Sequence, residues 1–268
     1  MKPLVTICLP VFNNAQYLHQ TIESIREQTY ENIEIVAVDD CSTDNSYEIL
    51  RLYEAGNFKL HKNHVNLGVK ANWNKCVELS SGKFIKMMGA DDLLLPECIA
   101  KQVKVIESVN VDLVSSNRFI ISDSGSVLLK LYYPFKGYVS FKQALRRLLG
   151  SGRNIIGEPV VCLMRKDALV AIGGFSALNN YVIDIDTWAK LINPKGLYAM
   201  EDFLSSFRIS SYSISSKEGF KQIKSVFEFI NSYQIFQLGF FTKFKAYFLA
   251  ILFGILRNIV FRYSNRKK

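Results

Sequence analysis

The sequence is poor in cysteine, and its few cysteines are scattered. The 268 residues include five, an odd number, and no two of them form a Cys-x-x-Cys motif. They are Cys8, Cys41, Cys76, Cys98 and Cys162. A disulfide framework uses cysteines in pairs, and a structural zinc site needs closely spaced ligands. The pattern therefore favours reduced, structural thiols in a cytoplasmic protein over either of these.

The glycine-rich phosphate loops of common nucleotide enzymes are also missing. No Gly-x-Gly-x-x-Gly follows the first apolar run, and no Gly-x4-Gly-Lys-Ser/Thr occurs in the chain. Their absence excludes a dinucleotide cradle and a P-loop. Residues 1–10 lack the layout of a signal peptide, and no internal repeat or low-complexity segment is present. With 49% hydrophobic and 21% charged residues, the composition is that of a globular protein.

Long apolar runs are absent, whereas one basic segment stands out. Residues 246–256 are eleven uncharged residues before Arg257, too few for the ~20 that span a bilayer. Residues 217–268 hold ten Lys and Arg and two acids, so they carry +8 of the net charge of +9. Basic residues among Phe and Tyr suit a helix on an anionic membrane surface. The alternative is packing against the rest of the chain or against a second copy in a homodimer. No nucleic-acid-binding motif accompanies the charge, so we expect no nucleic-acid partner.

Strand-like and helix-like segments alternate through the first 110 residues. Buried strands are predicted at 4–12, 33–40, 58–62 and 83–90, with apolar residues at helical spacing between them. This alternation predicts an α/β fold with a mostly parallel sheet flanked by helices. The second half is less regular, and residues 197–210 read as two short strands. Amphipathic helices are expected at the C-terminus.

Two of the predicted strands end in paired carboxylates. Asp39 and Asp40 close the second strand, and Asp91 and Asp92 follow the fourth. Ligands of open α/β sheets bind beyond the carboxyl ends of the strands, so both pairs should converge on one site. Carboxylate oxygens suit a hard divalent cation that takes further ligands from substrate phosphates. For each acid taken alone, a turn or helix-capping role is the alternative.

Several longer motifs carry a family resemblance. Residues 10–46 read PVFNNAQYLHQTIESIREQTYENIEIVAVDDCSTDNS, and residues 66–92 read NLGVKANWNKCVELSSGKFIKMMGADD. With IGEPVVCLMRKDALVAIGGF, DIDTWAKL and FRISSYSIS in the same order, the chain resembles a family 2 glycosyltransferase of the GT-A fold. The resemblance implies a glycosyltransferase domain over 1–216 and a helical segment over 217–268. Within the domain, 1–110 would bind the nucleotide-sugar and 111–216 the acceptor.

The resemblance implies a role for each matching residue. For nucleotide-sugar binding it indicates Pro10, Val11, Asn13, Asp39, Asp40, Ser42, Asn66, Gly68 and Asp92. Asp91 matches the acid that binds Mn²⁺ or Mg²⁺. Asp184 matches the catalytic base, with Asp186 as a fallback two residues away. Glu158 and Trp188 are assigned to the acceptor side, Trp188 behind the base; for Glu158 a turn role is the alternative.

The implied reaction is an inverting sugar transfer. The donor would be a nucleoside diphosphate sugar, by family habit a UDP-sugar, and the acceptor a hydroxyl of a lipid-linked saccharide. The setting would be bacterial O-antigen or capsule assembly at the cytoplasmic face of the inner membrane.

Two positions depart from the family pattern. Gly89 stands where the family often has a first acid, and Ser210 stands where many members have a histidine. Metal binding therefore rests on Asp91, and a catalytically silent nucleotide-sugar-binding or scaffold protein is the rival interpretation. A nucleotidyltransferase would need a glycine- and basic-rich loop after the first strand, which residues 10–18 lack.

Overall fold

The structure is a computed structural model of the chain. It describes residues 2–176, 182–209, 221–233 and 239–265, without the side chains of 221, 222, 240 and 256–265. Ser210 and the predicted boundary between residues 216 and 217 lie outside the described residues.

Strands and helices alternate through the first half as predicted. The elements are β1 (Val5–Val11), α1 (Ala15–Arg26), β2 (Ile33–Asp39), α2 (Ser46–Arg51), β3 (Phe58–Lys62), α3 (Val69–Leu79), β4 (Phe84–Met87), β5 (Leu93–Leu94) and α4 (Cys98–Ser108). Every residue of β2 and β4 is buried, as expected of strands covered on both faces.

The second half adds shorter helices and the rest of the sheet. Its elements are β6 (Leu113–Ile121), β7 (Val127–Leu131), β8 (Gly137–Val139), α5 (Phe141–Ser151), a 3-10 turn (Pro159–Val161), β9 (Cys162–Arg165), α6 (Lys166–Ala171), α7 (Ile183–Leu191), β10 (Leu197–Arg208), α9 (Lys221–Ser232) and α10 (Phe240–Asn265). The capping box at the start of α5, between Ser140 and Gln143, shows why that helix begins there.

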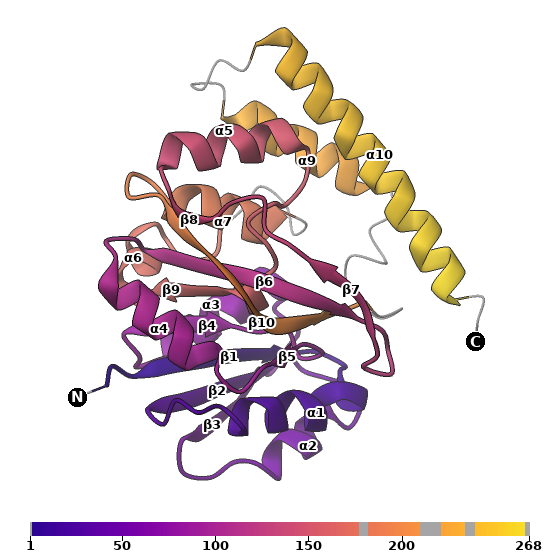
Figure 1. The fold of residues 1–268 in the computed structure, drawn as a ribbon. Helices are drawn as coiled ribbons and strands as arrows, with labels where there is room; N and C mark the ends of the chain where they lie inside the picture. Colours follow the sequence, from indigo (N-terminus) through magenta and orange to yellow (C-terminus); the bar gives the residue numbers. More distant parts are fainter. Residues whose placement is uncertain (1, 177–181, 210–220, 234–238, 266–268) are drawn as a thin grey trace.

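One continuous sheet joins the two halves, in the order β3-β2-β1-β4-β9-β6-β10-β5. β1 pairs in parallel with β2 and β4, β2 with β3, and β6 with β10. β9 runs antiparallel between β4 and β6, and β5, β7 and β8 are also antiparallel to their partners. The sheet is therefore parallel in the first half and mixed in the second. Helices cover both faces, with α1 and α4 in front and α3 behind in Figure 1.

Residues 197–208 form one strand rather than the two predicted. β10 runs for 12 residues beside β6, with register shifts around Phe203. Glu201 is exposed and Asp202 partly exposed at this irregularity, so two acids interrupt the apolar pattern without ending the strand. The polar interruption marks a bulge, which sequence periodicity alone does not distinguish from a turn.

The C-terminal segment forms two helices that pack on the body. α10 crosses α5 and α9 at the top of the molecule in Figure 1. The contact with α5 is close, because a Cβ on Gly152 would lie 2.2 Å from the Ala246 carbonyl oxygen. Among the described residues, no helix is both long and apolar enough to cross a bilayer.

Candidate active site

Asp39 ends β2 directly beside Val11, the last residue of β1. Its side chain is fully buried, and Oδ2 accepts a hydrogen bond from the Ser42 backbone N–H at 3.1 Å. Oδ1 is buried too and has no donor within the described part of the chain. Buried polar atoms are almost always hydrogen-bonded, so this oxygen is suited to accept an N–H or O–H from a ligand.

Asp40, the next residue, is bonded on both oxygens. Oδ1 accepts from Asn63 Nδ2 and from the Leu67 N–H, each at 2.8 Å, and Oδ2 accepts from the Gly68 N–H at 2.9 Å. Gly68 has a φ of 81°, which favours glycine. Asp40 therefore fixes the loop that contains Asn66 and Gly68.

The loops after β1 and β2 hold each other through Asn13. Its backbone N–H donates to Ser42 Oγ at 3.0 Å, and its side-chain Oδ1 accepts from the Thr43 N–H at 2.8 Å. Asn13 has a φ of 53°, a left-handed conformation that asparagine tolerates. Pro10 lies near the end of β1 and pairs in register with Val38 of β2. The predicted nucleotide-sugar residues of both loops thus lie at one rim of the sheet.

The second acidic pair occupies the turn between β4 and β5. Asp92 is buried, and its Oδ1 accepts from the Arg208 backbone N–H at 3.0 Å. The Arg208 guanidinium, also buried, donates to the Asp91 carbonyl at 2.8 Å. Burial raises the pKa of both carboxyls; their mutual repulsion raises that of Asp92 further, while the nearby Arg208 charge lowers both. A bound cation would offset this cost.

Gly89 lies against both carboxylates. A Cβ at this position would lie 2.7 Å from Asp92 Oδ2 and 3.1 Å from Asp91 Oδ1. No group of three or more His, Cys, Asp or Glu side chains among the described residues is arranged to hold a metal. The residues therefore fit a divalent cation held by Asp91 only if a ligand's phosphate oxygens complete the coordination.

Asp184 lies in the first turn of α7, partly buried. Its Oδ2 accepts from Asn154 Nδ2 at 2.7 Å, and its Oδ1 from the Ile185 N–H at 2.7 Å. Burial, with a smaller contribution from the charge of Glu158, raises the pKa of Asp184 to about 7. A carboxylate with such a pKa is suited to exchange protons near neutral pH.

Glu158 connects the two sides of the rim. Arg118 Nη2 donates to its Oε1 at 3.2 Å, and the two side chains form an ion pair. The Glu158 charge raises the pKa of Asp92 as well as that of Asp184. The Glu158 charge thus acts on two carboxylates that are 92 residues apart in the sequence.

Trp188, predicted on the acceptor side behind the base, lies in the interior of the protein. The indole is fully buried, and its Nε1–H donates to the Gly157 carbonyl at 2.9 Å, so it supports the site from behind. The fallback base Asp186 is buried; its Oδ2 pairs with Lys190 at 2.6 Å, and its Oδ1 accepts from Tyr233, the residue after α9, at 3.2 Å. Asp184 has no such cation on it within the described residues and is partly exposed, so it is the better candidate for the base.

Sequence reasoning missed Asn154, Arg118 and the role of Arg208. The Arg208 guanidinium donates to Gln20 Oε1 and to the carbonyls of Asp91, Ser122 and Asp123. No periodic pattern in the sequence indicates these contacts. The one available hint for Asn154 was its place in a glycine-containing loop just before Glu158.

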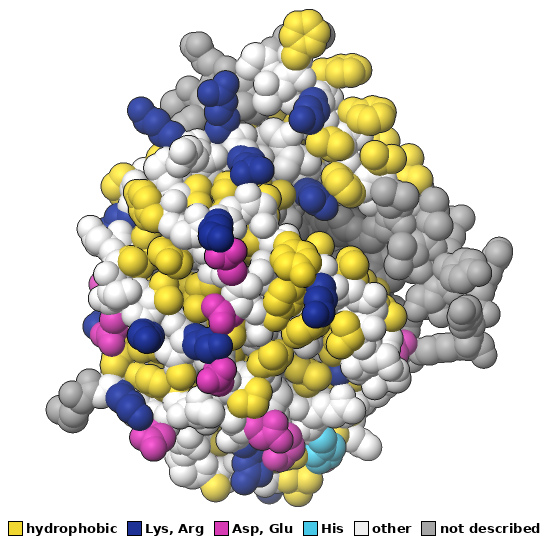
Figure 2. Space-filling model, in the orientation of Figure 1, with side chains coloured by type: hydrophobic (Ala, Val, Ile, Leu, Met, Phe, Trp, Pro, Cys, Tyr) yellow, Lys and Arg dark blue, Asp and Glu magenta, His cyan; other side chains and the backbone are white. Residues whose placement is uncertain are grey.

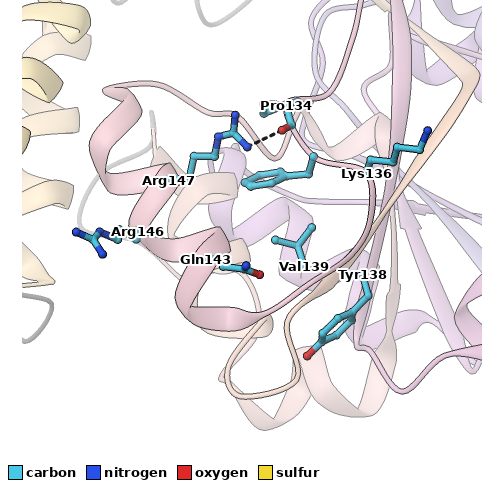
Figure 3. Close-up of a pocket in the computed structure, with 8 residues that line it drawn as sticks. Pro134, Lys136, Tyr138, Val139, Gln143, Arg146 and Arg147 are labelled. Carbon is cyan, nitrogen blue, oxygen red and sulfur yellow. Dashed lines mark hydrogen bonds between the residues drawn. The ribbon is translucent and has the colours of Figure 1, made fainter.

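A cavity of about 560 Å³ lies elsewhere, between the segment before β8 and α5 (Figure 3). It is lined by Pro134, Phe135, Lys136, Tyr138, Val139, Gln143, Arg146 and Arg147. None of these is a predicted site residue. Arg147 points across to the Pro134 carbonyl, to which it donates at 2.8 Å.

Comparison with known proteins identifies the class. The family model described as Glycosyl transferase family 2 matches residues 6–173, which is more than half of the chain. The chain therefore belongs to this glycosyltransferase family, and its fold is GT-A, as the sequence motifs predicted.

One curated relative matches almost end to end. This is the Escherichia coli protein WfgD, named as a UDP-Glc:alpha-D-GlcNAc-diphosphoundecaprenol beta-1,3-glucosyltransferase. It is 26% identical over 269 aligned positions, covering 99% of this chain and 98% of WfgD. Three other curated relatives are longer, and the chain spans 62–64% of each.

Solved structures share the fold at low identity. S. aureus TarS 1-349 in complex with UDP-GlcNAc aligns with a TM-score of 0.68 and 16% identity over 85% of this chain and 66% of TarS. The mannosyltransferase PcManGT of Pyrobaculum calidifontis, solved with GDP-Man and Mn²⁺, aligns with a TM-score of 0.64 and 18% identity over 98% of this chain and 73% of PcManGT. At these identities the likeness shows the fold alone.

Proposed function

We propose that the chain is an inverting glycosyltransferase that moves a sugar from a UDP-sugar to a lipid-linked saccharide in bacterial surface-polysaccharide assembly. The observation that carries this proposal is the buried Oδ1 of Asp39 at the sheet rim, which accepts no hydrogen bond from any described residue. A uracil or ribose donor group would satisfy that oxygen. Membership of the glycosyltransferase family and the name of WfgD supply the reaction and the acceptor class.

Asp184 is the proposed general base. The carboxylate takes the proton from the acceptor hydroxyl as that oxygen attacks the donor carbon, which contributes ~10²–10⁴-fold to the rate. Attack from the face opposite the leaving diphosphate inverts the configuration. Glu158, which is paired with Arg118 and whose charge acts on Asp184, is proposed to bind the acceptor sugar.

Asp91 is the proposed ligand of Mn²⁺ or Mg²⁺. A divalent cation there would neutralise charge on the departing diphosphate. Asp92 is proposed to face the donor sugar, and Asn13, Ser42, Asn66 and Gly68 to shape the nucleotide site above Pro10 and Val11. A structural relative was solved with Mn²⁺, in line with this cofactor class.

The test is transfer itself, with UDP-glucose as donor and GlcNAc-diphosphoundecaprenol as first acceptor. Donor binding is screened by thermal shift with UDP-, GDP- and dTDP-sugars, with and without Mn²⁺. The proposal expects a stabilising UDP-sugar and metal-dependent product. Donor binding without turnover on any lipid-diphosphate acceptor would instead support the silent scaffold, and no binding by any donor would contradict both.

Attachment to an anionic membrane surface is proposed through α10. The helix packs inward through Ala246 and Ala250, while six large apolar side chains point outward. These are Phe241, Phe244, Phe248, Ile251, Leu252 and Ile255. Figure 2 shows Lys and Arg side chains beside apolar ones over this part of the molecule. Lys142 and Arg146 of α5 and Lys245 of α10 are exposed, so both helices contribute positive charge.

Vesicle flotation tests this attachment. The double variant Phe244→Ser, Phe248→Ser should lose about tenfold or more of its binding to phosphatidylglycerol vesicles, because each Phe buries a large apolar area. Leu52→Ser is the matched control, because Leu52 is an exposed apolar residue outside α10, and this variant should bind vesicles as the wild type does. The wild-type protein could instead fail to bind vesicles and form a dimer that the double variant does not form. That result would assign the exposed apolar face of α10 to a homodimer interface.

A further inference from the structure

The amide of Asn154 is bonded on both of its ends. Oδ1 accepts from the Ile156 N–H at 3.0 Å and from the Gly157 N–H at 2.8 Å. Nδ2 donates to the Gly157 carbonyl at 2.8 Å and to Asp184 Oδ2 at 2.7 Å. One side chain thus joins the loop before Glu158 to the first turn of α7.

The partners fix which way the amide points. Two backbone N–H groups require an acceptor, and a carbonyl and a carboxylate require a donor. A flipped amide would place NH₂ against two N–H groups and its oxygen against two oxygens. The donor of Asn154 is therefore held toward Asp184 by the loop itself.

We propose that Asn154 is a positioning residue for the transfer reaction, holding the Asp184 carboxylate in one orientation and favouring its charged form. The inference rests on the proposed role of Asp184 as the base. Asn154 would not touch the substrate. It would act through the orientation and the protonation of the group that does.

The surroundings of Asp184 explain why such a donor matters. Burial and the charge of Glu158 both disfavour the carboxylate, and the Asn154 bond opposes them. Arg118 is paired with Glu158, the buried Cys162 thiol interacts with Asp184, and Asp186 on the same helix is paired with Lys190. Among these charged and titratable groups, none is a cation bonded directly to Asp184. Asn154 is therefore the side chain that directly donates to it within the described residues.

The same loop is tied to α7 at a second point. The Gly157 carbonyl accepts from Trp188 Nε1 as well as from Asn154. Gly157 has a φ of 105°, and a Cβ there would lie 2.5 Å from Val161 Cγ2. The loop is thus rigidly placed, and the Asn154 donor with it.

Asn154→Asp separates the positioning role from a structural one. The substitution keeps the shape and the Oδ1 acceptor of the two loop N–H groups, and it replaces the donor to Asp184 and to the Gly157 carbonyl with a negatively charged oxygen. The acid limb of the pH profile of kcat/KM should move to higher pH by about one unit or more. Transfer at pH 6.5 should fall about tenfold or more and recover at higher pH, a pH-selective loss that a purely structural defect would not produce. Asn154→Ala, which adds no charge, should shift the limb less in the same direction and serves if Asn154→Asp does not fold.

The pKa of Asp184 can also be measured without substrate, by ¹³C NMR of Asp-carboxyl-labelled protein, with Asp184→Asn to assign the signal. Asn110→Asp makes the same change at an exposed site and should match wild type. A titration midpoint that is the same in Asn154→Asp and wild type would overturn the inference whether or not transfer occurs. A raised midpoint in a protein that transfers nothing would support the contact and contradict the proposed function instead.

Discussion

The two acidic pairs at the sheet rim resemble each other, whereas the two members of each pair differ. Asp40 receives three hydrogen bonds and holds the loop at 66–68. Asp39, one residue earlier, keeps a buried oxygen that no described group satisfies. The same residue type at the same strand end thus serves the fold in one position and is left for a ligand in the other.

The two members of the second pair differ as well. Asp92 is buried and accepts the backbone N–H of Arg208, which fixes β10 to the turn. Asp91 lies partly exposed beside it. The lesson is that donors within reach, supplied by distant loops, decide which carboxylate remains available. Asp184 differs from both pairs: each of its oxygens accepts one protein donor, but the carboxylate is partly exposed, and each oxygen keeps a second lone pair for a hydroxyl.

Asp184→Asn should have the largest effect, lowering kcat ~10²–10⁴-fold, because an amide cannot accept the hydroxyl proton. UDP-sugar affinity should change little, which calorimetry can check. Near-normal transfer by this variant would show that Asp184 is not the general base.

The pH dependence of stability provides a second test of the raised pKa of Asp184. Its pKa is about 7 when folded and about 3.9 when unfolded, so the folded state holds more protons between these values. The stability contribution of the group therefore falls as pH rises from about 4 to 7. Asp184→Asn does not titrate, so its melting temperature relative to wild type should increase from pH 5 to pH 8. A constant difference would contradict the raised pKa.

Asp40→Ala should unfold more easily than wild type by about 2–4 kcal/mol, since it leaves buried donors without an acceptor. Urea denaturation measures the change. Asp39→Ala is the matched comparison, losing one backbone hydrogen bond and about 1 kcal/mol or less. Equal losses of unfolding free energy in the two variants would contradict the proposal that Asp40 serves the fold and Asp39 the ligand.

For donor binding, in contrast to stability, we expect a substitution of Asp39 to have a larger effect than a substitution of Asp40. Asp39→Ala is expected to weaken UDP binding about tenfold, the value of one hydrogen bond to a charged group, whereas a conservative Asp40→Asn should have less effect. Calorimetry with UDP and Mn²⁺ checks both. Unchanged affinity in Asp39→Ala would mean that its free oxygen does not face the nucleotide.

Gly89→Ala should have the smallest effect, costing about 1 kcal/mol of stability or somewhat more, because its Cβ would crowd the Asp92 carboxylate. Thermal melting tests it. A neutral result would show that the turn has room for the side chain that the family pattern often carries.

The parts of the fold set by local periodicity could be predicted from the sequence. The alternation through α4 and the rim positions of Asp39 and Asp91 followed from apolar runs and from the geometry of parallel strands. The irregular β10 did not, because Glu201 and Asp202 interrupt its pattern without ending it. Tertiary pairing overrode the local signal there.

The partners of the site residues were beyond sequence reasoning. Arg118 meets Glu158, and Asn154 meets Asp184, across separations of 40 and 30 residues with no repeating pattern. The burial of Trp188 likewise follows from packing between α7 and the loop at Gly157. Such contacts depend on how the elements are placed, which composition and spacing do not specify.

A crystal structure of the protein with UDP and Mn²⁺ tests most directly whether Asp39, Asp91 and Asp184 serve one sugar-nucleotide site. The account predicts a uracil or ribose group bonded to Asp39 Oδ1, the cation between Asp91 and the diphosphate, and Asp184 facing the place of the transferred sugar. Nucleotide bound away from Asp39, or with Asp184 on a different surface from the diphosphate, would contradict it.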